Sequence, residues 1–292
     1  MSASAASTSH VPSYVPNAPQ KRTPGSIVAN ILVVLVLIVF MFPILMIFLT
    51  SIKTRADALA SPPVWIFTPT FSNYTDIFQQ YPFAAYLRNS ILVATLNTLI
   101  ALLIGVPAAY ALARFRFRGD NHVQFWILSQ RMMPAIAAII PLFILFRRFG
   151  LTNSIFGLIL IYLTSSLPFI VFMLTRFFEE IPRELEEASL VEGSSWYGAM
   201  TRIAIPLAKP GIAATAIFTF IFSWNEFLFA LILTSTERAQ TMPVAVTLFI
   251  RETGIEWGYM TAVAVIMMIP TAILTLAAQR HLVQGLTMGA LK

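Results

Sequence analysis

Acidic side chains crowd one short segment of this sequence. Between Glu179 and Glu192 it holds six glutamates and a single basic residue, Arg183. An apolar stripe at helical spacing, which predicts a short amphipathic helix, runs through the same segment at Ile181, Leu185, Ala188 and Val191. Such a stripe needs a surface to cover it, and the net negative charge disfavours anionic lipid headgroups. The segment therefore predicts docking onto a protein with a basic groove, with a solvated charged face as the alternative.

A second short helix is expected directly after the first. Gly193 permits a sharp change of direction, and Ser194 or Ser195 is suited to cap the helix that follows. Pro206 and Pro210 are expected to end that helix. Its apolar face comprises Trp196, Met200 and Ile203. Residues 176–209 are thus interpreted as two short helices joined at a glycine.

Residue patterns typical of catalysis or metal binding do not occur in this sequence. A phosphate-binding loop requires Gly-x-x-x-x-Gly-Lys-Ser/Thr, and none of the four lysines follows a glycine. Cysteine is absent, and the histidines, His10, His122 and His281, lie outside the apolar stretches. We therefore expect no catalytic residue, no metal site and no cofactor bound by the chain itself.

Long apolar stretches must position the acidic segment. The 292 residues are 58% hydrophobic and only 11% charged, against roughly 25% charged in soluble proteins, which excludes a water-soluble globule. One helical crossing of a bilayer needs ~20 apolar residues. We predict an all-α polytopic membrane protein whose transmembrane domain occupies residues 27–282. Its six transmembrane helices are expected at about 27–52, 89–113, 123–146, 149–175, 210–236 and 257–279.

The distribution of basic residues predicts the orientation. Lys and Arg are enriched in cytoplasmic loops, and eleven of the 19 lie on the inner side when the N-terminus is placed there. Both termini and the 176–209 loop, between the fourth and fifth spans, are therefore predicted to be cytoplasmic. Residues 1–26 predict a disordered cytoplasmic tail, and residues 283–292 a second tail. The net charge of +6 is dispersed among loops and gives no case for nucleic acid.

Polar residues inside the apolar layer are candidates for a substrate pathway, because burying them is costly. Glu226 follows Trp224 and Asn225, and an aromatic face beside polar groups suits a polyol. The alternative for Glu226 is that it caps a helix, pairs within the bundle or extends outward to the membrane surface. Arg131 lies inside the third predicted span, where it either binds a ligand or pairs with carbonyls or an acid.

The segment from Glu187 onward resembles a known motif. Glu187-Ala188-Ser189, three residues, Gly193, nine residues and then Ile203-Ala204-Ile205-Pro206 is similar to the EAA motif of bacterial ABC importer permeases. Ser189 stands for the second alanine of the motif, and Ile205 stands for its leucine. Similarity to the carbohydrate branch of six-span, maltose-type permeases extends to residues 129–134, 140–143, 181–187, 223–227 and 284–287.

The resemblance implies a set of partners in a bacterial cytoplasmic (inner) membrane. Two homologous permeases form the pore, two ATPase subunits hold ATP and Mg below it, and an extracytoplasmic sugar-binding protein delivers a sugar or polyol from above. Loop 237–256, with Thr253, Gly254 and Glu256, is expected to contact the binding protein, and the C-terminal tail the ATPases. The residues expected to dock on the ATPase are Glu184, Glu187, Ala188, Ser189, Val191, Gly193, Ile203 and Pro206.

Other functions remain open at this point. An ion-coupled secondary transporter would normally show more than two ionisable groups within its spans. A permease for a non-sugar solute, or a scaffold that only anchors a soluble partner, would fit the same apolar stretches.

Overall fold

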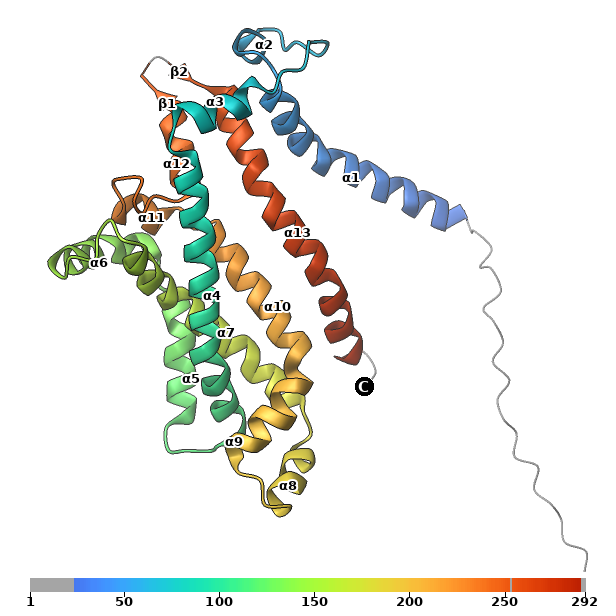
Figure 1. Ribbon diagram of the computed structural model, residues 1–292. Helices are drawn as coiled ribbons and strands as arrows, with labels where there is room; N and C mark the ends of the chain where they lie inside the picture. Colours follow the sequence, from blue (N-terminus) through green and yellow to red (C-terminus); the bar gives the residue numbers. More distant parts are fainter. Residues whose placement is uncertain (1–23, 253, 290–292) are drawn as a thin grey trace, which may run out of the picture. The chain divides into compact units, whose positions relative to one another are not determined.

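The described part of the chain is almost entirely helical (Figure 1). The computed structural model describes residues 24–252 and 254–289. Its α-helices are α1 (Pro24–Ser51), α2 (Arg55–Leu59), α3 (Ser72–Gln80), α4 (Phe83–Arg114), α5 (Asp120–Ser129), α6 (Ala135–Arg148), α7 (Ile155–Glu180), α8 (Arg183–Val191), α9 (Trp196–Ala199), α10 (Ile205–Trp224), α11 (Leu228–Leu233), α12 (Met242–Ala245) and α13 (Trp257–Gly289). Two short strands, β1 (Ile250–Arg251) and β2 (Gly254–Ile255), form an antiparallel pair.

Residues up to Met46 form a unit of their own, which holds most of α1. Every side chain from Ile27 to Leu45 is exposed, although the run Ile27–Ser51 has a mean hydropathy of 3.4. A helix that is apolar all round requires an apolar environment. Its length of 25 residues is enough to cross a bilayer.

The second unit, residues 47–292, is built around α4, α7 and α10. Close packing between these helices depends on small residues, which let backbones approach. A Cβ on Gly105 of α4 would lie 2.5 Å from Ile170 Cγ2 of α7, and one on Gly211 of α10 would lie 2.5 Å from the Phe177 ring of α7. These contacts leave no room for larger side chains along the three-helix core.

Within residues 24–252 and 254–289, five helices are long and apolar enough to span a membrane, and a sixth candidate is bent. The span expected at 123–146 is not one continuous helix, because α5 and α6 meet at an angle of 95°. Pro134, the N-cap of α6, has no backbone N–H to donate, and Met133 before it is extended, with φ −73° and ψ 124°. A residue that precedes proline is sterically disfavoured in the α region, which explains the break.

The predicted boundaries of the fifth span are also wrong. The helix that includes α10 runs from Trp196 to Trp224 and then breaks before α11, so it neither begins at 210 nor reaches 236. Pro206 and Pro210 do not end a helix. Both lie in the first two turns of α10, directly after a π-helical turn at Met200–Ala204. Proline is tolerated in a first turn, which accommodates Pro206, whereas Pro210 lies inside α10 without ending it.

Several shorter elements lie at the two ends of the core. Figure 1 shows α8 and α9 at one end of α4, and α3, α12 and the β1–β2 hairpin at the other. With 32 residues, α4 separates these ends by ~48 Å. The last helix, α13, continues to Gly289, through most of the predicted tail at 283–292. Residues 1–23 of the predicted N-terminal tail lie outside the described residues.

Candidate functional site

The helices α8 and α9 are joined by a bend that local hydrogen bonds and a glycine stabilise. The Ser194 N–H donates to the Ser189 carbonyl and the Gly193 N–H to the Leu190 carbonyl, both at 3.0 Å, which is a Schellman motif. Gly193 supplies the left-handed backbone that this motif needs, with φ +91°. Ser195 Oγ then accepts the Gly198 N–H at 3.2 Å and caps α9. The expected change of direction at Gly193 is therefore present.

The outer surface of this helix pair is apolar and acidic. Leu185 is 47% exposed, Val191 89%, Trp196 44% and Tyr197 72%. Ile181, which was predicted on the same face, is instead buried against the core. Of the residues predicted to dock, Glu184, Glu187, Ala188, Val191, Gly193 and Pro206 are exposed, and Ser189 and Ile203 are half-buried. Apart from the Phe115 ring, whose centroid lies 4.9 Å from that of Trp196, this surface has no cover within the described residues.

The opposite side of α8 is attached to the bundle through a buried ion pair. Arg114, the last residue of α4, donates from Nε and Nη2 to Glu186 Oε1 at 2.9 and 2.7 Å. Tyr110 donates its hydroxyl proton to the other carboxylate oxygen, Oε2, at 2.7 Å. The two charged side chains are only 2% and 1% exposed. We call Tyr110, Arg114 and Glu186 the Glu186 cluster.

Two backbone contacts strengthen this attachment. Arg114 Nη2 also donates to the carbonyl of Ile181 at 3.1 Å, just before α8. Arg183, the first residue of α8, donates from Nη2 to the Ala113 carbonyl at 3.1 Å. The start of α8 is therefore tied to the end of α4 by side chains from both helices.

A second polar cluster lies at the centre of the bundle. Asn97 of α4 donates from Nδ2 to Ser166 Oγ of α7 at 2.8 Å and to Ser223 Oγ of α10 at 2.6 Å. All three side chains are buried, and Asn97 Oδ1 has no partner among the described residues. These bonds join the three core helices at one level of the membrane domain.

The predicted pathway residues around Glu226 have mainly structural contacts. Glu226 accepts the N–H of Phe229 at 2.9 Å and of Ala230 at 3.2 Å, so its carboxylate caps α11. This was one of the two alternatives for Glu226. Trp224 is 1% exposed and donates its indole N–H to a backbone carbonyl of α13. Asn225 is exposed at the break between α10 and α11.

Arg131 does not lie within a continuous transmembrane helix as predicted. It belongs to the 3₁₀ turn Gln130–Met132, where α5 ends and the chain bends, and its side chain is exposed. Its guanidinium lies 4.9 Å from the ring centroid of Phe169, a cation–π contact. The Phe169 ring in turn meets the ring of Phe222 in α10 at 5.4 Å. Arg131 therefore faces α7, one aromatic layer from α10.

The β1–β2 hairpin forms part of a polar cavity at the opposite end from α8. Gly254 has φ +120° in this hairpin, and Glu256 forms an ion pair with Arg55 at 2.9 Å. The cavity of about 360 Å³ is also lined by Asp76 and Gln80. Thr253, the third residue predicted to contact a binding protein, lies outside the described residues.

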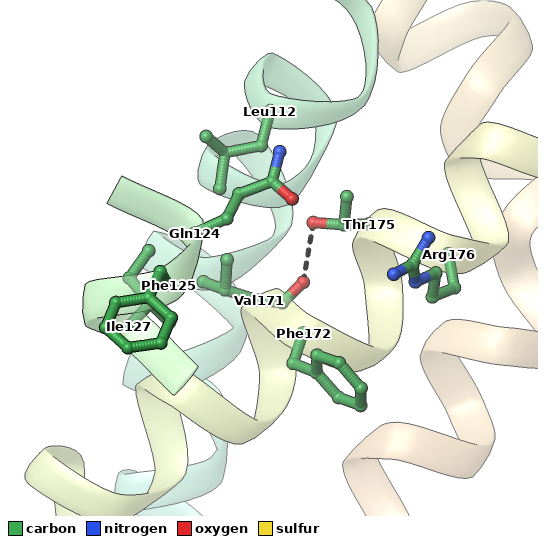
Figure 2. A pocket seen from close by; sticks show the side chains of 8 residues that line it. All are labelled: Leu112, Gln124, Phe125, Ile127, Val171, Phe172, Thr175 and Arg176. Carbon is green, nitrogen blue, oxygen red and sulfur yellow. Dashed lines mark hydrogen bonds between the residues drawn. The ribbon is translucent and has the colours of Figure 1, made fainter. Parts of the chain in front are cut away.

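Figure 2 shows a smaller cavity of about 130 Å³ between α4, α5 and α7. Its only bond among the drawn side chains is internal, since Thr175 Oγ1 donates to the Val171 carbonyl at 2.7 Å. Ligand pockets usually measure about 300–1,000 Å³, so this cavity is too small for a sugar. Its lining residues are Leu112, Gln124, Phe125, Ile127, Val171, Phe172, Thr175 and Arg176. None of them is a predicted pathway residue.

Comparison with known proteins identifies the family. Residues 101–288 match the sequence profile of the binding-protein-dependent transport system inner membrane components. The chain belongs to this family. Its members are permease subunits of ABC transporters in the bacterial inner membrane, which agrees with the several membrane-spanning helices found here.

Curated relatives align with nearly the whole permease. The trehalose transport system permease protein SugB of Mycobacterium tuberculosis is 40% identical, over 86% of this chain and 92% of its own. The sulfoquinovosyl glycerol transport system permease protein SmoH of Agrobacterium fabrum is 38% identical, over 86% of this chain and 89% of its own. A solved bacterial ABC transporter involved in the import of the acidic polysaccharide alginate shares the fold, with a TM-score of 0.74 at 24% identity, covering 91% of this permease and 99% of that chain.

Two polar residues that join helices, Glu186 and Asn97, were not predicted from the sequence. Glu186 is one of six glutamates in its segment, and only its contacts with α4 distinguish it. Asn97 is uncharged and lies within an apolar span, so a search for charged residues passed over it. A search for every amide inside the spans would have found Asn97, because an amide in the membrane is costly unless it is bonded.

Proposed function

We propose that this permease forms half of the translocation pathway for a sugar or polyol in an ABC importer. Relatives named for trehalose, maltose and sulfoquinovosyl glycerol transport support this substrate class. The single observation that carries the proposal is the α8–α9 surface. It is apolar and acidic, lacks a cover among the described residues, and is attached to the bundle through buried Glu186.

The α8–α9 surface is the docking site of the ATPase subunits in this proposal. Glu187 pairs with a basic residue of the ATPase, while Ala188 and Val191 pack into its cleft. ATP and Mg belong to the ATPase subunits, of which there are two, and a second homologous permease completes the pore. Both termini of this chain and the α8–α9 pair then lie in the cytoplasm, in agreement with the distribution of Lys and Arg.

The hairpin end of the molecule then faces an extracytoplasmic sugar-binding protein. Glu256 lines a polar cavity there, as does Arg251, the β1 partner of Gly254, and Thr253 belongs to the same loop. Between the two ends, Asn225 and Arg131 are proposed to line the pathway because both are exposed beside chain breaks. Trp224 and Glu226 contribute by stabilising the break between α10 and α11 through their hydrogen bonds.

The docking proposal is tested by reversing one charge. Glu187→Lys is expected to insert normally but to lose co-purification with the ATPase subunit of the same transport system. Glu180→Lys is the matched control, because Glu180 is an exposed glutamate at the end of α7, outside the proposed docking residues. Normal capture of the ATPase by Glu187→Lys would contradict the docking role, as would equal losses in both variants.

The substrate class is tested separately with the assembled transporter in proteoliposomes. We expect ATP-dependent uptake of at least one radiolabelled sugar from a panel of trehalose, maltose and sorbitol, with the binding protein present outside. Uptake that proceeds without ATP would support an ion-coupled transporter instead.

A further inference from the structure

We propose that the Glu186 cluster transmits motion of the ATPase-bound helix α8 to α4, and that α4 carries it to the outer loop that begins at Glu237. This inference rests on the proposed docking function. It makes Arg114, Glu186 and Tyr110 positioning residues for transport, and it adds a route that chain connectivity does not provide.

The covalent connections of the α8–α9 pair lead only to α7 and α10. α7 ends at Glu180, two residues before α8, and α9 continues through the π turn into α10. By contrast, α4 is followed by α5, and no backbone connection joins it directly to α8. Force from α8 can therefore reach α4 indirectly, through α7 and α10 that pack against it, or directly, through side-chain contacts between α8 and α4. The Glu186 cluster supplies the direct contact.

The geometry of the cluster makes it a rigid attachment. One carboxylate accepts three hydrogen bonds, two from Arg114 and one from Tyr110. The same guanidinium also binds the carbonyl of Ile181, so it holds both α8 and the residue before it. Because both charges are buried, sliding α8 along α4 would leave each without a partner, which is strongly unfavourable. The pair therefore favours movement of α8 and α4 as one body.

The far end of α4 is attached to the outer loop in a similar way. Asn89 donates from Nδ2 to the carbonyls of Glu237 and Gln240, at 2.8 and 2.9 Å. Ser90 Oγ accepts the N–H of Met242 at 2.8 Å. Asn89 is fully buried, and it lies 25 residues before Arg114 in a helix that is continuous through Pro107. Thus ~38 Å of one helix separates two buried polar attachments.

The test uses the complete transporter and the absence of native cysteine. Leu103→Cys on α4 and Glu192→Cys at the end of α8 are both exposed sites for nitroxide labels, whose separation is measured by electron–electron double resonance. In the otherwise native chain, we expect the same separation without nucleotide and with MgATP and vanadate. A second readout is the stimulation of ATP hydrolysis by the extracytoplasmic binding protein.

Two variants break the cluster in different ways. Glu186→Gln removes the charge but keeps the shape, while Arg114→Met with Glu186→Leu replaces the pair by apolar side chains of similar volume, which buried sites often tolerate. The control is Arg118→Met, since Arg118 is an exposed arginine on the segment after α4. We expect the cluster variants to retain the ATPase subunits, to show a label separation that changes with nucleotide, and to lose stimulation by the binding protein.

The outcomes separate this inference from the proposed function. If the double variant keeps full stimulation of ATP hydrolysis and an unchanged label separation, this inference is wrong but the proposed function stands. If the double variant does not assemble, the cluster serves folding and the inference is wrong. If the unmodified chain captures no ATPase, the proposed function fails and the inference fails with it.

Discussion

Gly193 provides a direct test of the bend between α8 and α9. Its backbone has φ +91°, in the region that L-residues rarely adopt, and a Cβ added there would meet no atom within 4 Å. The cost of Gly193→Ala is therefore conformational and free of any clash. It should amount to about 1–2 kcal/mol, the penalty for a left-handed L-residue.

This penalty converts into a loss of ATPase affinity if the bent pair is the form that binds. Each 1.4 kcal/mol corresponds to about tenfold in an equilibrium constant, so Gly193→Ala should weaken binding of the ATPase subunit by up to about 5- to 30-fold. Gly193→Asn is the matched control, because asparagine tolerates the left-handed conformation better than alanine does. The expected order of affinity is Gly, then Asn, then Ala.

The assay is a titration of fluorescently labelled ATPase subunit onto the permease in lipid nanodiscs. Thermal melting of each variant should stay close to that of the native chain, since the bend lies outside the bundle core. Equal affinity of the alanine and glycine forms would refute the reasoning, and so would an asparagine form that binds more weakly than the alanine form.

Three further substitutions probe the bundle. Asn97→Leu removes two interhelical hydrogen bonds worth roughly 0.6 kcal/mol each in a membrane. The free energy of unfolding of this variant should therefore fall by about 1 kcal/mol in steric-trapping measurements, and a gain in stability would contradict this. Gly211→Val places a side chain within 2.5 Å of the Phe177 ring and should lower the free energy of unfolding by about 1–3 kcal/mol, which is measured as a lower melting temperature. An unchanged melting temperature would show that α7 and α10 separate easily. Glu226→Ala removes the cap of α11 and should lower the local stability of this helix by about 0.5–2 kcal/mol, with faster hydrogen exchange at the Phe229 amide. Unaltered exchange at that amide would exclude the capping role.

Hydropathy predicted most spans but not the bend between α5 and α6. Pro107 and Pro168 lie inside α4 and α7 without ending them, whereas Pro134 lies between an extended Met133 and the first residue of a new helix. The three prolines follow similar apolar neighbours, so composition does not distinguish them. What differs is whether surrounding helices hold the chain in a straight path, and that depends on tertiary contacts.

The local features of the candidate site were predictable, and the long-range ones were not. Gly193 and Ser195 act on backbone groups within five residues, so their roles follow from nearby sequence. Glu226 likewise caps amides three and four residues later, which sequence reasoning left as one of two alternatives. Glu186 differs because its partner, Arg114, is 72 residues away. No local rule pairs one of six glutamates with that arginine.

The two faces of α8 make different contacts, one with the ATPase in the proposed function and one with α4, so substitutions on each face should have different effects. A helix of nine residues is ~14 Å long and marginal by itself, so it depends on tertiary contacts on its sides. Glu186 points into the bundle while its neighbour Glu187, about 100° further round the helix, is exposed. A change at Glu187 should therefore release the ATPase, whereas a change at Glu186 should retain the ATPase and lose its effect on α4. If both substitutions instead released the ATPase to the same extent, α8 would have one contact surface, and the separation of docking from transmission would be wrong.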